Sequence, residues 1–131
     1  MTSFFFPHAE RLKVAAKAAE IESWYNSQLN GGYPTGNGYN LAATVSDQTR
    51  FTQDAVLQTN LLSLEMAAGS DIIGFLDATG TPRSMTITAY ITLLSQYGQW
   101  CRAKLLQQAT LLGQLNAATT IEDVNAIDPN A

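Results

Sequence analysis

Apolar residues near the start of the chain recur at helical spacing. Spacings of four, three and four residues place four of them on one helical face: Val14, Ala18, Ile21 and Tyr25. The helix is predicted to begin at His8, directly behind Pro7, because proline suits the start of a helix. Gly31 and Gly32 provide the stop signal. The many alanines of this segment favour the helix and also let another helix approach closely.

A second helix is predicted after a glycine-rich loop. Ser46 is a suitable N-cap, Asp47 adds negative charge at the positive helix end, and Gly69 marks the stop. The helix carries two apolar stripes, Phe51, Ala55, Leu62 and Met66 on one side, and Leu57, Leu61, Leu64 and Ala68 on another. Two stripes indicate burial on more than one side.

A hairpin is predicted between residues 72 and 88. Ile72–Leu76 and Arg83–Ile87 are short strand candidates, and the turn cluster "DATGTP" separates them. Because two strands alone are marginally stable, the hairpin is expected to pack against a helix.

The longest helix is predicted from about residue 88 to residue 116. Its apolar seam repeats at nearly heptad spacing through Leu94, Tyr97, Cys101, Leu105, Gln108, Leu112 and Leu115. A helix of this length extends roughly 43 Å. Packing within the domain is the preferred explanation of the seam, and a coiled coil with further copies is the alternative. Thr119 and Glu122 then stand at capping-box spacing before a short C-terminal helix that Pro129 terminates.

The pattern as a whole predicts a mainly α protein. Three main helices carry a small β-hairpin near residues 72–88, and a short helix closes the chain. No linker divides the sequence, so residues 8–131 are predicted to form one domain behind an apolar N-terminal arm, residues 1–7. The apolar fraction of 46% and the charged fraction of 14% are typical of a folded chain.

Charge and hydropathy argue against two classes of binding partner, nucleic acids and membranes. The net charge is −4 and the seven basic residues are scattered, so no nucleic acid partner is expected. No stretch reaches the roughly 18 uninterrupted apolar residues of a membrane span, and no secretory signal is recognised at the start. We therefore expect no membrane partner and synthesis in a cell's cytoplasm.

Two residues are weighed as a nucleophilic pair. Cys101 is the only cysteine, and its place on an apolar helix stripe favours a small buried side chain over a reactive thiol. His8 is the only histidine, which excludes a two-histidine metal site and favours a surface or capping role. Neither residue lies in a recognisable catalytic signature.

Other candidate chemistry has local explanations. Three carboxylate pairs are considered: Glu20 with Glu22, Asp71 with Asp77, and Glu122 with Asp123. The first pair points in different directions on a helix, the second flanks a strand, and the third stabilises a first turn. The loop "GGYPTGNG" matches no phosphate or dinucleotide motif. No catalytic, cofactor-binding or metal-binding residue is predicted, and the chain is not expected to be an enzyme.

Aromatic rings leave one binding alternative open. Trp24, Tyr25, Tyr33 and Tyr39, together with Trp100, are the rings that a sugar or peptide groove would use. Core packing and loop anchoring are the preferred explanation of these rings.

The order of features resembles a small domain of unknown function common in tailed-bacteriophage and prophage proteins, especially tail fibre and tail-fibre-associated proteins. The resemblance covers about residues 10 to 127. Matching positions open the middle helix at Ser46, Asp47, Thr49 and Arg50, and form the hairpin turn at Asp77 and Gly80. Further matching positions lie near the end of the chain, at Leu115, Ala118, Thr120, Glu122, Asp123, Val124, Ala126 and Ile127.

The resemblance implies a structural component of a tailed-phage virion, a tail or fibre-attachment protein. Its partners would be other phage structural proteins and further copies of itself. An assembly chaperone that leaves the particle and a glycan-binding tail-tip module are the alternatives. Phe4, Phe5 and Phe6 of the arm are predicted to bind a partner, because three exposed phenylalanines are costly in water. Packing of the arm on its own helices is the competing explanation.

Overall fold

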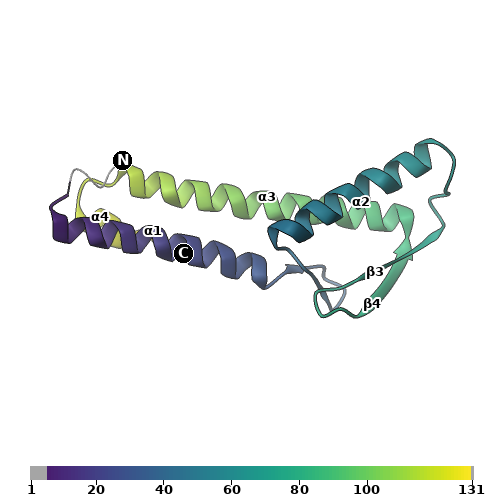
Figure 1. Ribbon diagram of the computed structural model, residues 1–131, viewed down its shortest axis with the longest axis horizontal. Coiled ribbons are helices and arrows are strands. Elements are labelled where there is room, and N and C mark those ends of the chain that lie inside the picture. The colour runs from purple at the N-terminus through teal and green to yellow at the C-terminus, as the bar shows by residue number, and fades with distance from the viewer. Residues whose placement is uncertain (1–5, 131) are drawn as a thin grey trace. The chain divides into compact units, whose positions relative to one another are not determined.

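The computed structural model describes residues 6–130, which are mainly helical (Figure 1). The elements in chain order are α1 (His8–Asn30), β1 (Tyr33–Pro34), β2 (Asn40–Leu41), α2 (Val45–Ser63), β3 (Ile72–Leu76), β4 (Pro82–Thr86), α3 (Ile87–Ala117) and α4 (Ile121–Asn125). The strands form two separate antiparallel pairs, β1 with β2 and β3 with β4. The predicted fold class is therefore confirmed, and the short β1–β2 pair is an addition to it.

The chain divides into two compact units. Unit 1 contains the described residues of Met1–Gln28 and Ala103–Ala131, and unit 2 is Leu29–Arg102. Each unit has a hydrophobic core of its own. The long helix α3 contributes residues to both units, and the sequence-based prediction of one domain from residue 8 onward stays a prediction.

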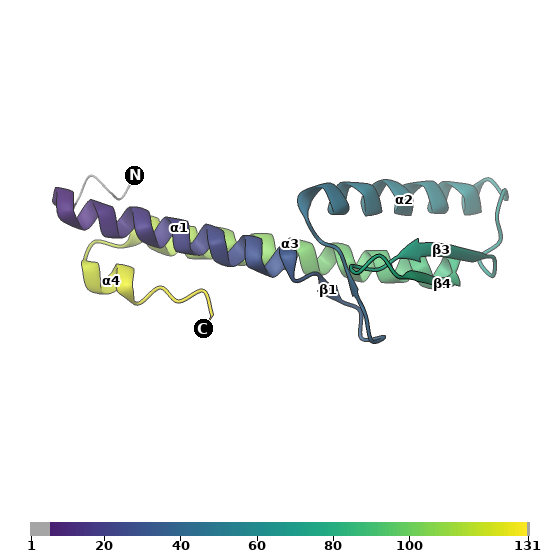
Figure 2. The same ribbon diagram turned by 60° about the horizontal axis from the view of Figure 1, so that its bottom comes forward.

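Unit 1 is built from α1, the C-terminal part of α3, and α4, which lie together in Figures 1 and 2. The predicted face of α1 is the buried one, because Val14 and Ile21 lie in the core and Ala18 and Tyr25 pack against it. The core is completed by Phe6, Trp24, Leu111, Leu115, Ala118, Val124 and Ile127. Helical periodicity alone was therefore sufficient to identify the inner side of α1.

Unit 2 packs α2 and the β3–β4 hairpin on the N-terminal part of α3. Phe51 of α2 and Tyr90 of α3 are almost completely buried, at 2% and 1% exposure. Phe75 of β3 stacks on Tyr90 with ring centroids 5.1 Å apart, so the hairpin covers the helix as expected. The second strand is Pro82–Thr86, one residue earlier than the sequence predicts.

Two helix caps differ from the prediction by one or two residues. Thr44, not Ser46, caps α2, and its backbone N–H and side chain both bond to Asp47 in a capping box. Ser46 has Thr49 three residues later and so lacks the acidic partner that closes such a box. Thr120, not Thr119, caps α4, with the N–H of Asp123 bonded to its hydroxyl at 3.1 Å.

The outer side of α2 is more exposed than its two apolar stripes suggest. The helix ends at Ser63 rather than near Gly69, and the chain turns away at Glu65, which has a φ of 57°. Leu57 and Leu64 of the second stripe are 51% and 68% exposed. The expected burial of α2 on a second side is therefore wrong for unit 2 as the structure describes it.

Candidate functional site

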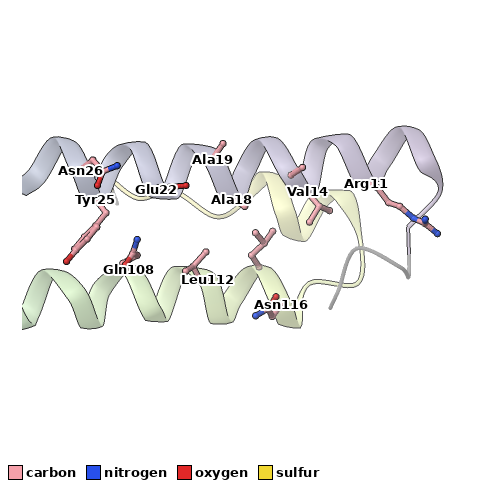
Figure 3. Close-up of a pocket in the computed structure, with 12 residues that line it drawn as sticks. Arg11, Val14, Ala18, Ala19, Glu22, Tyr25, Asn26, Gln108, Leu112 and Asn116 are labelled. Atoms are coloured by element: carbon pink, nitrogen blue, oxygen red, sulfur yellow. The ribbon is translucent and has the colours of Figure 1, made fainter.

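An open pocket lies in unit 1 between α1 and the C-terminal part of α3 (Figure 3). Its volume is about 850 Å³. One wall includes Ala15, Ala18 and Ala19 of α1, and the other includes Leu112, Leu115 and Asn116 of α3. We call this pocket the α1–α3 groove.

Small side chains on α1 create the groove. The lining positions of α1 include Arg11, Ala15, Ala18, Glu22 and Tyr25, at spacings of four, three, four and three residues. Such spacing keeps them on one helical face, and the alanines in its centre leave space that larger residues would fill. The floor is apolar, because Val14 and Leu115 belong to the core and Leu112 packs against it.

Opposite charges stand apart along the groove. Arg11 lies near one end, where its Nε atom donates a hydrogen bond to the carbonyl oxygen of Phe6 at 2.7 Å. Glu22 lies eleven residues further along α1, about 16 Å away along the helix axis. Neither side chain has an ion pair within residues 6–130. The polar residues that α3 adds, Gln108 and Asn116, are uncharged.

Two lysines fix the elements around the groove. Lys17 donates to the carbonyl oxygen of Ile127 at 2.9 Å and pairs with Glu20 at 2.8 Å, so it ties α1 to the segment behind α4. Lys104 of α3 donates to the side-chain oxygen of Gln28 at 3.0 Å. These bonds join α1 to its neighbours from outside the groove and leave its lining free of lysine.

A buried carboxylate in unit 2 has a structural explanation. The side chain of Asp77 is 2% exposed and accepts bonds from the hydroxyl and N–H of Thr79, the N–H of Thr81 and the guanidinium of Arg83. The Thr79 hydroxyl is the largest cause that lowers the pKa of Asp77 from 3.8 to about 2. Gly80 has a φ of 80°, so Asp77 and Gly80 form the turn that the sequence predicts.

A second buried polar network joins α2 to α3. The hydroxyl of Tyr90 donates to one carboxylate oxygen of Asp54, and the amide of Gln58 donates to the other at 3.3 Å. Burial is the main cause that raises the pKa of Tyr90, with the bond to Asp54 adding to it. No buried side-chain polar atom of the described residues lacks a hydrogen-bond partner. The network therefore stabilises the packing of α2 and offers no unsatisfied group to a ligand.

The residues predicted to bind a partner are described in part. Phe6 is 3% exposed and lies in the core of unit 1. Phe4 and Phe5 lie outside the described residues, so the partner-binding role of the arm stays a prediction. The burial of Phe6 gives that residue a packing role within its own unit.

The two residues weighed as a nucleophilic pair lie in different surroundings. Cys101 is buried in the core of unit 2, as expected, and burial raises the pKa of its thiol. A raised pKa disfavours the reactive thiolate. His8 is exposed and begins α1. Within residues 6–130, no group of three or more histidine, cysteine or acidic residues is arranged to hold a metal ion.

The aromatic residues pack in two different cores. Trp24 belongs to the core of unit 1, whereas Tyr33, Tyr39 and Trp100 pack against the core of unit 2. Tyr33 contacts Trp100 and Tyr97 at ring-centroid distances of 5.6 and 5.8 Å. These contacts are of the kind expected for packing, and the glycan-binding alternative stays a prediction.

Comparison with known proteins assigns the chain to a family. The family described as "Domain of unknown function (DUF4376)" matches residues 12–128. The chain belongs to this family. The matched segment spans most of both units and contains the alanines and Glu22 of the groove, whereas Phe6 and Arg11 precede it. No curated protein and no solved structure matches the chain. Across residues 6–130, no helix combines the length and the hydropathy of a membrane span.

Sequence reasoning identified the alanines but not the charges beside them. The many alanines of α1 were recognised as residues that let another helix approach, whereas Arg11 and Glu22 were not recognised as sharing a helical face with Ala15 and Ala18. Their spacing from Ala15 and Ala18 follows the heptad rule and carries the signal. That signal gains meaning only with the structure, because α3 and α4 must leave this side of α1 open.

Proposed function

We propose that this chain is a structural component of a tailed-phage particle, a tail or fibre-attachment protein that acts through contacts with other proteins. The observation that carries the proposal is the α1–α3 groove, which is open, floored by apolar side chains and built on two helices. The sequence resemblance to domains of tail fibre and tail-fibre-associated proteins supplies the phage context.

The side chains that line the groove are better suited to binding a protein segment than to catalysing a reaction. Alanine and leucine surfaces bind by burying apolar area, and the amides and charges beside them set orientation. Of the titratable residues of the lining, Arg11 lies about 16 Å from Glu22 along α1, whereas Glu22 and Tyr25 are neighbours on one helical face. Such a surface supports stable contacts within an assembly.

The composition of purified particles tests this proposal. Mass spectrometry of phage particles purified from cells that express the gene should detect the chain at a fixed ratio to other tail proteins. Absence of the chain from mature particles would sink the virion proposal. Presence only in particles stalled during fibre assembly would instead support the assembly chaperone, which uses the same groove and then leaves.

A further inference from the structure

We propose that the α1–α3 groove is covered by a second copy of this chain, with the two α1 helices antiparallel across a two-fold axis. This inference deepens the proposed function, because it names the partner of the same groove. It commits to one occupant, and the reason lies in the charge pattern of α1.

The charges on the open face of α1 are complementary to those of a second α1 helix that runs in the opposite direction. Arg11 and Glu22 are equally far from a point between residues 16 and 17. A two-fold axis through that point places each Arg11 opposite Glu22 of the second copy, and so forms two ion pairs. The same axis places Ala15 opposite Ala18 of the second copy. An isologous contact requires this kind of self-complementarity.

Repulsion between like charges, as well as attraction between opposite charges, favours the antiparallel direction of the two α1 helices. Two parallel α1 helices would bring Arg11 beside Arg11 and Glu22 beside Glu22. Like charges at facing positions destabilise helix pairs, as they do in coiled coils. The charge pattern therefore disfavours the parallel arrangement and favours the antiparallel one.

Small residues at the centre allow a close approach. Ala15 and Ala19 are exposed, and Ala18 is half-buried. With alanines on both sides, helix axes approach to about 8 Å, at the short end of normal helix packing. The backbone and Cβ atoms of the second α1 then enter the groove and contact the half-buried Leu112 on its floor.

The other charged residues of α1, Glu10 included, lie away from this face. At 100° per residue, Lys13, Lys17 and Glu20 lie on the far side of α1 from the line through Arg11 and Glu22. The α3 wall contributes neutral side chains, and Leu105, one heptad before Leu112, is 52% exposed on the same side of that helix. The surface next to the axis is therefore apolar, with its charges at the two ends.

Charge reversal on the full chain tests the contact. Sedimentation velocity over a concentration series should show a dimer for the wild-type chain. Arg11→Glu and Glu22→Arg should each raise the dimer dissociation constant by about tenfold or more, because each creates two like-charge contacts. The double variant Arg11→Glu/Glu22→Arg restores both pairs in reversed order and should dimerise like the wild type. Circular dichroism and thermal unfolding verify that each variant is folded.

A mixed cross-link tests the register. Disulfides should form faster in an equimolar mixture of the folded Ala15→Cys and Ala18→Cys variants than in either variant alone, because the axis pairs residue 15 with residue 18. Cys101 is present in all samples and is buried, so it serves as a common background. Equal rates in all three samples would overturn this register.

The outcomes separate this inference from the proposed function. A wild-type chain that remains monomeric at the highest concentration overturns the self-pairing, as does a double variant that fails to recover the dimer. If such a monomer is nevertheless found in purified particles, the proposed virion role stands and a different protein covers the groove.

Discussion

The guanidinium of Arg83 donates a hydrogen bond to the carboxylate of Asp77 across the β3–β4 hairpin, with Nε and Oδ2 3.0 Å apart. The same guanidinium lies over the ring of Tyr39, 4.6 Å from its centroid. The N–H of Ala78, next to Asp77, donates to the carbonyl oxygen of Asn40 in β2 at 2.8 Å. The hairpin turn is thus attached to the β1–β2 pair by a backbone hydrogen bond and by the Arg83 guanidinium, which the buried carboxylate of Asp77 holds in place.

Asp77 should make the stability of the chain depend on acid pH. Its pKa is lowered from 3.8 in the unfolded state to about 2 in the folded state, so its contribution is complete above pH 4 and lost as the pH falls toward 2. Near pH 3 the wild-type chain should take up about one more proton on unfolding than Asp77→Asn does. Urea unfolding between pH 2 and 6 measures this difference in slope.

Glu122→Gln provides the matched control for Asp77→Asn. Glu122 is an exposed carboxylate in the first turn of α4, outside the hairpin. This variant should keep the steep wild-type loss of stability below pH 4. A wild-type slope in Asp77→Asn as well would show that Asp77 is not the titrating group.

Two buried tyrosines of α3 should differ in the cost of losing a hydroxyl. Tyr97 donates to the neutral carbonyl oxygen of Ala42 at 2.7 Å, whereas Tyr90 donates to the carboxylate of Asp54. Tyr97→Phe should therefore lower the free energy of unfolding by about 1 kcal/mol and Tyr90→Phe by about 2 kcal/mol, because bonds to charged groups are stronger. Chemical denaturation at pH 7 compares the two, and the reverse order would contradict the network.

Phe6 should contribute measurably to the stability of unit 1. Phe6→Ala is expected to lower the free energy of unfolding by about 3 kcal/mol, because a buried ring leaves a cavity. If Phe4 and Phe5 bind a partner, Phe4→Ala/Phe5→Ala should leave thermal unfolding unchanged and abolish incorporation into particles. Equal destabilisation by both variants would place the whole arm in the core instead.

Two glycines with the same backbone conformation should respond differently to alanine. Gly32 and Gly36 have φ values of 79° and 80°, but only at Gly32 would a Cβ atom stand 2.8 Å from the carbonyl oxygen of Leu41. Gly36→Ala should cost about 1 kcal/mol for the backbone alone, and Gly32→Ala should cost clearly more. Thermal unfolding measures both, and equal losses would show that the loop relaxes around the added methyl group.

Local sequence signals predicted most of the elements, because they act within a few residues. Apolar periodicity identified the buried face of α1, and Asp77 with Gly80 identified the hairpin turn. The caps of α2 and α4 were placed one or two residues away because several threonines and serines compete as N-caps. The bonds between Thr44 and Asp47 decide the cap of α2, and the bond between Thr120 and Asp123 decides that of α4.

Burial was less predictable wherever it depends on distant segments. Leu57 and Leu64 form an apolar stripe in the sequence, yet the hairpin and α3 cover only the opposite side of α2. Phe6 has no periodicity around it, and its burial depends on packing within unit 1. A hydrophobic pattern shows which residues favour burial. Which of them are actually buried depends on the segments that pack against them in the folded protein.

The sequence by itself determined the presence of the four helices and of the β3–β4 hairpin, the inner face of α1 and the turn at Asp77, since these depend on neighbouring residues and on a helical or strand repeat. The tertiary structure decided which apolar faces are covered, how Tyr90 meets Asp54, and that the face bearing Arg11 and Glu22 stays open beside α3. The physical reason is that core packing joins residues far apart in the chain, and no local pattern specifies which partners meet.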